Sequence, residues 1–244
     1  MIVPRFRVFA GPNGSGKSTI KGEIDPALIK MYVNADDLEK EAKASGFIDL
    51  ATFEVTTTLS KLLTFHTEHY LIKNKELSNQ VKQIGLLGTK VDYRNVEVNS
   101  YLASVISDFI RQRLLEKGVS FTFETVMSHR SKVDFMGEAQ ARGYRTYLYF
   151  VSTENPAINI DRVGIRVREG GHPVAPEKVS ERYHKSLGLL PDAIAVSNRA
   201  YIFDNSGDST VLLAEITDGI SLEFRTDEVP DWLFESYVDK VETI

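Results

Sequence analysis

This 244-residue chain contains a complete phosphate-binding loop near its N-terminus, a motif that few folds can accommodate. Its residues are Gly11, Pro12, Asn13, Gly14, Ser15, Gly16, Lys17, Ser18 and Thr19. The loop directly follows the apolar, β-prone run Arg7–Ala10. A strand that ends in a glycine-rich turn and opens into a helix aims backbone N–H groups and the helix dipole at one small volume. This context predicts a nucleotide-binding P-loop (Walker A), because a plain glycine-rich loop leaves the Lys-Ser-Thr ending unexplained.

The residue types of the loop also predict its ligands. Glycines allow backbone angles and close approaches that a Cβ atom would block. Lys17 is expected to reach the β- and γ-phosphates of ATP, and Ser18 is expected to ligate Mg²⁺.

The composition excludes several classes of protein. A formal net charge of −5 with 26% charged residues argues against a nucleic-acid-binding protein, which would be expected to carry an excess of Lys and Arg. No stretch approaches the ~20 apolar residues of a membrane span, and the N-terminus enters a predicted strand instead of presenting a signal peptide. We therefore expect a cytoplasmic protein. The chain also has no cysteine, which excludes disulfides, thiolate zinc sites and cysteine nucleophiles.

Strand and helix patterns alternate along the chain, which predicts a mainly parallel sheet with helices on both faces. Strand patterns lie at Arg7–Ala10, Met31–Asn34, Ser120–Glu124, Thr146–Val151 and Ala200–Asp204. Helical patterns lie at Lys17–Ile24, Leu38–Ala44, Ser100–Lys117, Lys132–Arg142 and Pro176–Leu190. The fold class expected is α/β, a three-layer α/β/α P-loop NTPase domain with five or six strands that spans residues 1–244.

Residues 51–99 do not fit this minimal scheme. The segment is long, polar and interrupted by glycines, and we interpret it as an inserted subdomain that is largely helical. Within it, Thr52–Lys73 is predicted to be helical and Val91–Val98 to form an arm of a hairpin. The pattern fits a surface elaboration and a platform for a substrate or partner equally well.

Two acidic residues follow the second predicted strand. Ligands of open α/β sheets bind beyond the carboxyl ends of the strands, so Asp36 and Asp37 should face the phosphate loop. Asp36 is the candidate base that accepts the proton of an acceptor hydroxyl during phosphoryl transfer. The alternative is that one of the two acids caps the helix that begins at Leu38.

The third predicted strand ends in Glu124 and Thr125, at the same edge of the sheet. Glu124 is a candidate to bind a substrate hydroxyl or a metal-bound water, with Thr125 beside it. Thr125 and Ser128 also fit ordinary N-caps for the next helix. His129 is expected to be a surface or loop residue.

A series of arginines follows the fourth predicted core strand, namely Arg162, Arg166, Arg168 and Arg182. The spacing puts Arg162 and Arg166 near one face of a helix, and the pair Gly170-Gly171 supplies a turn or hinge. Residues 161–182 are therefore predicted to form a lid whose guanidinium groups stabilise charge on the transferred phosphoryl group. The alternative is a solvated helix that pairs with Asp161 and Glu169.

The last predicted strand ends in the turn Asp204–Gly207. P-loop kinases commonly contact the adenine base at this place, so Asn205 is a candidate to bind the ring. A type I turn before a hairpin explains the same residues equally well. Thr210–Phe224 is predicted to form that hairpin around Asp218-Gly219, and Trp232-Leu233 to anchor a terminal helix.

Taken together, these motifs resemble the zeta-toxin family of P-loop kinases, and the stand-alone branch of that family in particular. The resemblance spans most of the chain and rests on Ala10–Thr19, Asn34–Asp37, Phe123–Thr125, Arg162–Arg168, Gly170–Val174, and Arg182-Tyr183 with Ser186-Leu187. Characterised bacterial toxins of the family phosphorylate UDP-N-acetylglucosamine. The resemblance implies that Asp36 is the base, that Lys17 binds phosphate, and that Arg162 with Arg166 or Arg168 completes the site.

The chain departs from the family pattern at two places. Where the family's toxins carry a second lid arginine, this sequence has His172-Pro173-Val174, so the function of that arginine must move to Arg166 or Arg168 or be lost. The insertion at 51–99 replaces a short connection on the side where the acceptor should enter.

The leading hypothesis is an ATP- and Mg²⁺-dependent kinase that acts on a hydroxyl of a small acceptor, such as a UDP-sugar. A nucleotide-dependent switch that binds a protein partner and an antibiotic phosphotransferase remain open. The sequence also leaves open whether an antitoxin binds this chain.

Overall fold

The computed structural model describes residues 3–171 and 173–241, which form two compact units. The larger unit combines the described residues up to Lys30 with those from Thr122 onward, and the smaller unit spans Met31–Phe121. The segment 51–99 lies within the smaller unit. His172, part of the Gly-Gly-His motif quoted above, lies outside the described residues.

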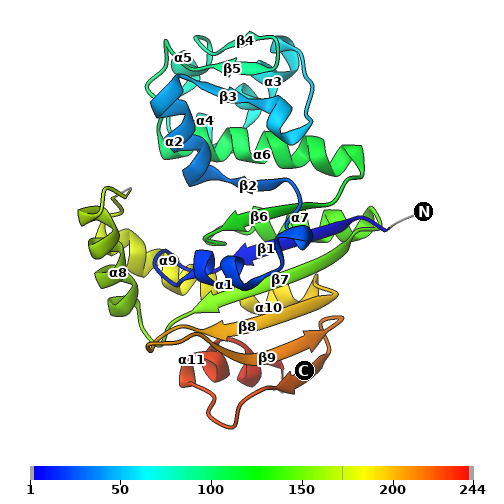
Figure 1. Ribbon diagram of the computed structural model, residues 1–244, viewed down its shortest axis with the longest axis vertical. Helices are drawn as coiled ribbons and strands as arrows, with labels where there is room; N and C mark the ends of the chain where they lie inside the picture. Colours follow the sequence, from blue (N-terminus) through cyan, green and yellow to red (C-terminus); the bar gives the residue numbers. More distant parts are fainter. Residues whose placement is uncertain (1–2, 172, 242–244) are drawn as a thin grey trace. The chain divides into compact units, whose positions relative to one another are not determined.

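The larger unit is built on a mostly parallel sheet (Figure 1). Its strands are β1 (Arg5–Ala10), β6 (Phe121–Thr125), β7 (Arg145–Ser152), β8 (Arg199–Asp204), β9 (Val211–Thr217) and β10 (Ser221–Phe224). They lie in the order β10-β9-β8-β7-β1-β6. The strand β7 pairs in parallel with β1 and β8, whereas β9 and β10 add antiparallel pairs at one edge. The carboxyl ends of β1, β7 and β8 therefore meet at one edge of the sheet.

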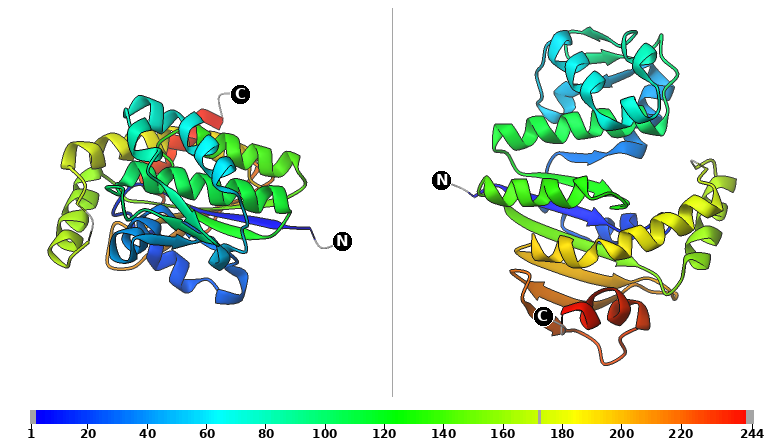
Figure 2. Two further views of the ribbon diagram at one scale, coloured as in Figure 1. Left: turned by 90° about the horizontal axis from the view of Figure 1, so that it is seen from above. Right: turned by 180° about the vertical axis from the view of Figure 1, so that it is seen from behind.

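Helices cover both faces of this sheet, as the three-layer prediction requires (Figures 1 and 2). Helix α1 (Lys17–Glu23) lies on one face. The opposite face carries α7 (Ser131–Ala141), α9 (Pro176–Gly188), α10 (Leu190–Ala195) and α11 (Asp231–Leu233). The remaining helical segments are η1 (Pro26–Leu28), α8 (Pro156–Arg168), η3 (Phe234–Val238) and α12 (Asp239–Val241).

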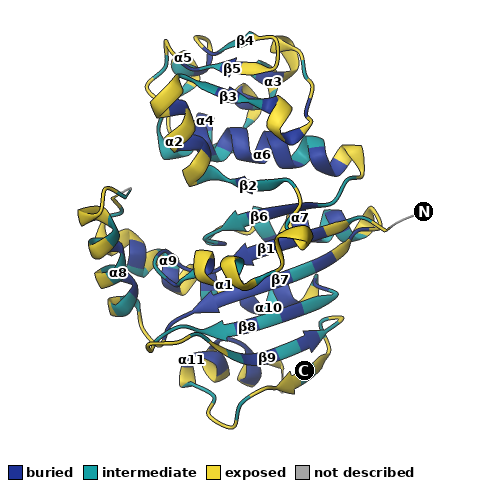
Figure 3. Ribbon diagram, in the orientation of Figure 1, coloured by how far each residue is buried: buried dark blue, intermediate teal, exposed yellow. Residues whose placement is uncertain are grey.

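The core of the larger unit lies between these layers, and the central strands are its most buried part (Figure 3). In β1, every residue from Phe6 to Ala10 is buried, and Leu148 to Val151 of β7 are buried beside them. A central parallel strand is covered on both faces, so it is apolar along most of its length. This explains why the sequence marks these strands clearly.

The smaller unit contains its own three-stranded antiparallel sheet, in the order β3-β5-β4. The elements of the smaller unit are, in chain order, β2 (Tyr32–Asn34), α2 (Ala35–Ser45), β3 (Phe47–Asp49), η2 (Leu50–Phe53), α3 (Leu59–Glu68), α4 (Tyr70–Asn74), α5 (Ser78–Val81), β4 (Gly85–Leu87), β5 (Lys90–Asp92) and α6 (Ser100–Lys117). Helix α6 packs against α2, α3 and α4. Its residues Leu102, Val105, Ile106, Phe109, Ile110 and Leu114 are all buried. The helix predicted at Ser100–Lys117 is thus confirmed with the same bounds.

The structure confirms the α/β class and the core strands of the prediction, and corrects several details. The segment 52–73 is not one helix, because the β-branched run Val55–Thr58 separates η2 from α3. Only Val91 and Asp92 of the expected hairpin arm 91–98 belong to a strand. The helix expected at Pro176–Leu190 ends at Gly188 and is followed by α10. None of the helices in the described ranges combines the length and apolar character needed to cross a membrane.

Candidate functional site

The phosphate loop connects the buried strand β1 to helix α1, as the sequence predicts. Gly11 and Gly16 have φ values of +138° and +96°, which side chains rarely tolerate. A Cβ atom on Gly11 would lie 2.0 Å from the carbonyl oxygen of Val151. A Cβ atom on Gly16 would lie 2.0 Å from Nδ2 of Asn205. Both glycines are therefore required by the fold of the loop as well as by its motif.

Lys17 opens α1 and turns back over the loop. Its buried ammonium donates hydrogen bonds to the carbonyl oxygens of Gly11 at 2.9 Å and Pro12 at 3.0 Å. No side chain caps the start of α1, and its first turn contains no acidic residue. The positive end of this helix is thus left to interact with an anion.

Ser15 supplies a second sign that the loop is built to receive a ligand. Its side chain is fully buried, and its Oγ has no hydrogen-bond partner among the described residues. A buried hydroxyl without a partner costs free energy unless a ligand or water satisfies it. Ser18, the candidate Mg²⁺ ligand, is exposed in the first turn of α1. The described residues contain no cluster of three or more His, Cys, Asp or Glu side chains suited to a metal ion.

Helices α8 and α9 both contact Asn13 of the loop. From α8, the fully buried Asn159 donates its Nδ2 hydrogen to the Asn13 carbonyl oxygen at 2.7 Å. From α9, Arg182 donates to Oδ1 of Asn13 at 3.2 Å. The next residue, Tyr183, donates its hydroxyl to the Thr153 carbonyl oxygen at 2.6 Å. Two helices from the predicted lid region are therefore anchored at the phosphate loop.

Asn159 was not among the residues predicted from the sequence. The residue lies three positions before Arg162, so both share one face of α8. Asn159 also stands between Ile158 and Ile160 as a polar residue in an apolar run. That interruption is the one signal in the sequence that could have identified it.

The turn after β8 approaches the phosphate loop from another side. Asn205 donates its Nδ2 hydrogen to the Ser15 carbonyl oxygen at 2.9 Å, and its Oδ1 accepts from the Thr210 hydroxyl at 2.9 Å. Arg162 of α8 donates to the Asn205 carbonyl oxygen at 2.6 Å. Arg162 also reaches the carbonyl oxygens of Ser206 at 3.5 Å and Gly207 at 3.4 Å. The guanidinium of Arg162 thus holds this turn in place.

The other two predicted lid arginines lie in the last turn of α8. Arg166 is half-buried, and its carbonyl oxygen accepts from the N–H of Gly171 at 2.8 Å. Arg168 is exposed and lines a groove of about 630 Å³ between α8 and α9. The groove is mainly apolar, with Ile160, Val163, Ile165, Val167, Pro173, Val174, Pro176 and Val179 in its walls.

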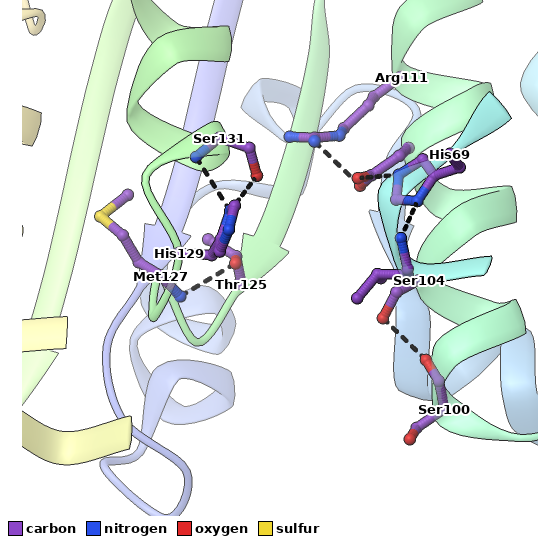
Figure 4. A network of polar contacts seen from close by, with 10 residues as sticks. His69, Ser100, Ser104, Arg111, Thr125, Met127, His129 and Ser131 are labelled. Carbon is purple, nitrogen blue, oxygen red and sulfur yellow. Dashed lines mark hydrogen bonds and ion pairs between the residues drawn. The ribbon is translucent and has the colours of Figure 1, made fainter. Parts of the chain in front are cut away.

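Glu124 and Thr125 lie at the carboxyl end of β6, and both are half-buried. The Thr125 hydroxyl accepts from the Met127 N–H at 3.0 Å (Figure 4). This turn supports the positive φ of +53° at Met127. His129 is exposed, and its Nδ1 bonds to the Ser131 hydroxyl at 2.9 Å, at the start of α7. Thr125 therefore shapes the loop that follows β6 and does not cap α7.

Asp36 lies in the smaller unit, in the first turn of α2 and directly after β2. The N-cap of this helix is Asn34, whose Oδ1 accepts from the Asp36 N–H at 2.9 Å. Asp36 and Asp37 are both exposed. The alternative that either acid caps α2 is excluded, because Asn34 fills that role.

The smaller unit also contains a buried polar cluster that the sequence analysis did not identify (Figure 4). His69 Nε2 lies 3.2 Å from Asp108 Oδ2, and Asp108 Oδ1 pairs with Arg111 at 2.9 Å. His66 lies nearby in α3, where its Nδ1 donates to the Leu62 carbonyl oxygen at 2.8 Å. Burial lowers the pKa of His66 from 6.5 to about 4. His66 is therefore neutral at neutral pH and belongs to the packing of this unit.

Comparison with known proteins relates this chain to one family. The family model described as zeta toxin matches residues 73–214, which is more than half of the chain. The match includes β6, α8, α9 and the Asn205 turn, and it begins after the phosphate loop and Asp36. An uncharacterised protein of Haemophilus influenzae is 29% identical over 69 residues, which cover 28% of this chain and 49% of that protein.

Solved structures share the fold at low sequence identity. The AvrRxo1-ORF1:AvrRxo1-ORF2 complex with sulphate ions gives a TM-score of 0.54 at 15% identity, covering 92% of this chain and 62% of that chain. The same complex with ATP gives 0.52 at 17% identity, covering 91% and 61%. A structure from the PezAT chromosomal toxin–antitoxin system of Streptococcus pneumoniae gives 0.50 at 13% identity, covering 100% and 85%. This chain thus spans less than two thirds of the AvrRxo1 chains and about half of the Haemophilus relative.

Proposed function

Because this chain belongs to the zeta toxin family, we propose that it is a kinase that transfers the γ-phosphate of ATP to a hydroxyl group of a small acceptor. The observation that carries the proposal is the phosphate loop itself. It joins a central strand to a helix, it turns Lys17 inward, and it is held by α8, α9 and the turn after β8. This arrangement is typical of a site that positions nucleotide phosphates.

The loop residues fit ATP as the phosphoryl donor. The close approaches around Gly11 and Gly16 leave a cradle made of backbone, and the unpartnered Ser15 hydroxyl adds a donor within it. Lys17 would exchange its bonds to the carbonyl oxygens of Gly11 and Pro12 for phosphate oxygens. One structural relative, the AvrRxo1-ORF1:ORF2 complex, has been solved with ATP, which agrees with this proposal.

Mg²⁺ would be held by the Ser18 hydroxyl and by phosphate oxygens, and it would neutralise charge on the transferred group. The exposed position of Ser18 in the first turn of α1 suits that role.

Asp36 is the proposed general base. As the acceptor oxygen forms a bond to the γ-phosphorus, the bond from that phosphorus to the β,γ-bridging oxygen breaks and ADP leaves. The hydroxyl proton passes to the Asp36 carboxylate. Asp36 is available for this role because Asn34 performs the capping of α2. Its neighbour Asp37 is equally exposed and serves as a matched comparison.

Arginines of the α8–α9 segment would stabilise charge on the transferred phosphoryl group. We keep Arg162, Arg166 and Arg168 in this proposal and add Arg182, which already contacts Asn13 of the loop. Arg162 would act after release from the carbonyl oxygens of the 205–207 turn. Such a release is the kind of motion that a lid segment makes when substrate binds.

A sugar nucleotide similar to UDP-N-acetylglucosamine is the proposed acceptor. Glu124 and Thr125 would contribute to its binding from the carboxyl end of β6. The segment 51–99, which contributes β4 and β5 to the three-stranded sheet of the smaller unit, is the proposed source of any difference in acceptor from other family members.

A second candidate is a nucleotide-dependent switch that binds a protein partner. It is favoured by two structural relatives, one solved as an ORF1:ORF2 complex and the other belonging to a toxin–antitoxin system. An antitoxin-like protein is therefore the proposed partner class.

The deciding experiment measures transfer of labelled γ-phosphate from ATP to a panel of UDP-sugars, free sugars and aminoglycosides. Wild type is compared with Lys17→Ala, Asp36→Asn and the matched control Asp37→Asn. A kinase predicts label on one acceptor class for wild type and Asp37→Asn. It also predicts a loss of at least about a hundredfold for Asp36→Asn. Lys17→Ala should lose ATP binding as well.

Two other outcomes would redirect the proposal. An aminoglycoside labelled in place of any UDP-sugar would retain the kinase and replace its acceptor. The switch would be favoured if wild type binds ATP but labels no acceptor, and if Asp36→Asn binds ATP as wild type does.

A further inference from the structure

We propose that Asn159 and Asn205 are positioning residues that hold the phosphate loop in its phosphate-binding conformation, and that Asn205 acts in this way instead of reading the adenine base. This inference rests on the nucleotide site proposed above. It assigns the Asn205 turn a role in phosphate affinity and removes it from base selection.

The two side chains bind alternate carbonyl groups of the loop. Asn159 donates to the carbonyl oxygen of Asn13 at 2.7 Å, and Asn205 donates to that of Ser15 at 2.9 Å. In a planar trans peptide, the C=O of one residue and the N–H of the next point in opposite directions. Fixing these two carbonyl groups therefore fixes the N–H groups of Gly14 and Gly16. Both N–H groups point away from the asparagines and are free to face a bound phosphate.

Each asparagine is oriented by a threonine hydroxyl. Thr210 donates to Oδ1 of Asn205 at 2.9 Å, and the Thr153 hydroxyl bonds to Oδ1 of Asn159. A bonded Oδ1 directs the NH₂ group of the same amide toward the loop, since the two ends of the amide point in different directions. The same construction occurs twice, on α8 and on the turn after β8.

The glycines of the loop fit against these asparagines. A Cβ atom on Gly14 would lie 2.6 Å from the carbonyl oxygen of Asn159, and one on Gly16 would lie 2.0 Å from Nδ2 of Asn205. The asparagines can reach the loop backbone only because these two positions lack side chains. The two glycines of the loop and the two asparagines that contact it are thus complementary in shape.

Asn205 is also held through its backbone. Its N–H donates to the Ser152 carbonyl oxygen at 2.9 Å. With both ends of its amide and its backbone bonded to protein, the residue is fixed toward the loop. This geometry suits a residue that positions the phosphate loop, and it is poorly suited to recognition of the adenine base.

The test compares the affinities of Asn205→Ala and wild type for ATP, GTP and inorganic tripolyphosphate, by calorimetry at fixed Mg²⁺ and salt. Tripolyphosphate has no base, so it reports the phosphate loop alone. We expect Asn205→Ala to weaken all three ligands by a similar factor, about tenfold for one hydrogen bond. Thr210→Val is nearly isosteric and should weaken all three in the same direction and by less.

Asn198→Ala is the matched control. Asn198 stands just before β8, at the opposite end of that strand from Asn205, and its side chain bonds to Thr146 and Asp218. This variant should lower the melting temperature without changing the affinity for any of the three ligands. The control therefore separates a loss of fold stability from a loss of loop positioning.

The inference is overturned if Asn205→Ala weakens ATP alone and leaves GTP and tripolyphosphate unchanged, because that pattern marks a base reader. It is also overturned if Asn205→Ala and Thr210→Val leave all three affinities unchanged. A wild type that binds none of the three ligands overturns the proposed function itself, and the inference with it.

Discussion

At the scale of single residues, the phosphate loop depends on contacts that lie far away in the sequence. Asn13 meets Asn159 and Arg182, and Ser15 meets Asn205. These partners lie between 146 and 190 positions along the chain from the loop. The motif therefore specifies a loop that can bind phosphate, while α8, α9 and the turn after β8 hold it in that conformation.

The glycines of the N-terminal region allow a direct residue-scale prediction. Gly11→Ala places a Cβ atom 2.0 Å from the Val151 carbonyl oxygen, at a φ of +138°. We expect it to lower the free energy of unfolding by at least about 2 kcal/mol and to weaken ATP binding. Thermal melting and calorimetric titration measure the two effects.

The control for this prediction is Gly22→Ala in α1. A Cβ atom on Gly22 would meet nothing within 4 Å, and the position is helical. Gly22→Ala should raise stability by up to about 1 kcal/mol and leave ATP binding unchanged. Equal losses in both variants would contradict the steric argument.

At the scale of secondary-structure elements, helix α3 contains His66, a buried residue whose protonation should lower the stability of the smaller unit at acidic pH. Burial lowers the pKa of His66 to about 4, against 6.5 in the unfolded chain. Between these two values the unfolded chain binds more protons than the folded one, so stability must fall as the pH drops from about 6.5 to about 4. Above pH 6.5 the contribution of His66 is constant.

The predicted size of this acid effect is at most about 3 kcal/mol. Urea unfolding of wild type and His66→Gln at several pH values measures it, with far-UV circular dichroism as the probe. Wild type should lose stability across this window, and His66→Gln should lose less over the same range. The exposed His129→Gln variant should follow wild type, and a flat wild-type profile would contradict the assignment.

At the scale of the whole molecule, the chain has two compact units, each with its own buried residues. Trp232, the only tryptophan in the sequence, is buried in the larger unit, where its indole N–H donates to Asp204 at 2.9 Å. Its fluorescence reports the unfolding of the larger unit, whereas circular dichroism reports both units. We expect the two unfolding curves not to coincide.

Ligand binding should separate these curves further. With Mg²⁺ and ATP at a hundred times the Kd, the larger unit should gain about 2.7 kcal/mol, because the ligand binds only the folded state. The Trp232 transition should therefore move to higher urea. If the fluorescence and dichroism curves coincide with and without ATP, the two units unfold as one.

Elements whose cause is local could be predicted from the sequence. The P-loop glycines, Lys17 and the apolar run before them predict the proposed nucleotide site, because a strand, a tight turn and a helix start each leave a pattern of a few residues. The same holds for α6, whose predicted bounds Ser100–Lys117 match the structure, and for the β9–β10 hairpin, where Asp218 and Gly219 both have positive φ.

The contacts between side chains at the site could not be predicted and follow from how distant segments pack. Nothing in the local pattern shows that Asn159 and Asn205 bind the loop carbonyl groups, that Arg162 holds the turn after β8, or that Arg182 reaches Asn13. Of the three-stranded sheet β3-β5-β4, only part of β5 was predicted from the sequence, because its strands are three residues long. Hydrogen bonds between distant segments depend on how the whole sheet and its helices pack, and that packing leaves no short-range signal in the sequence.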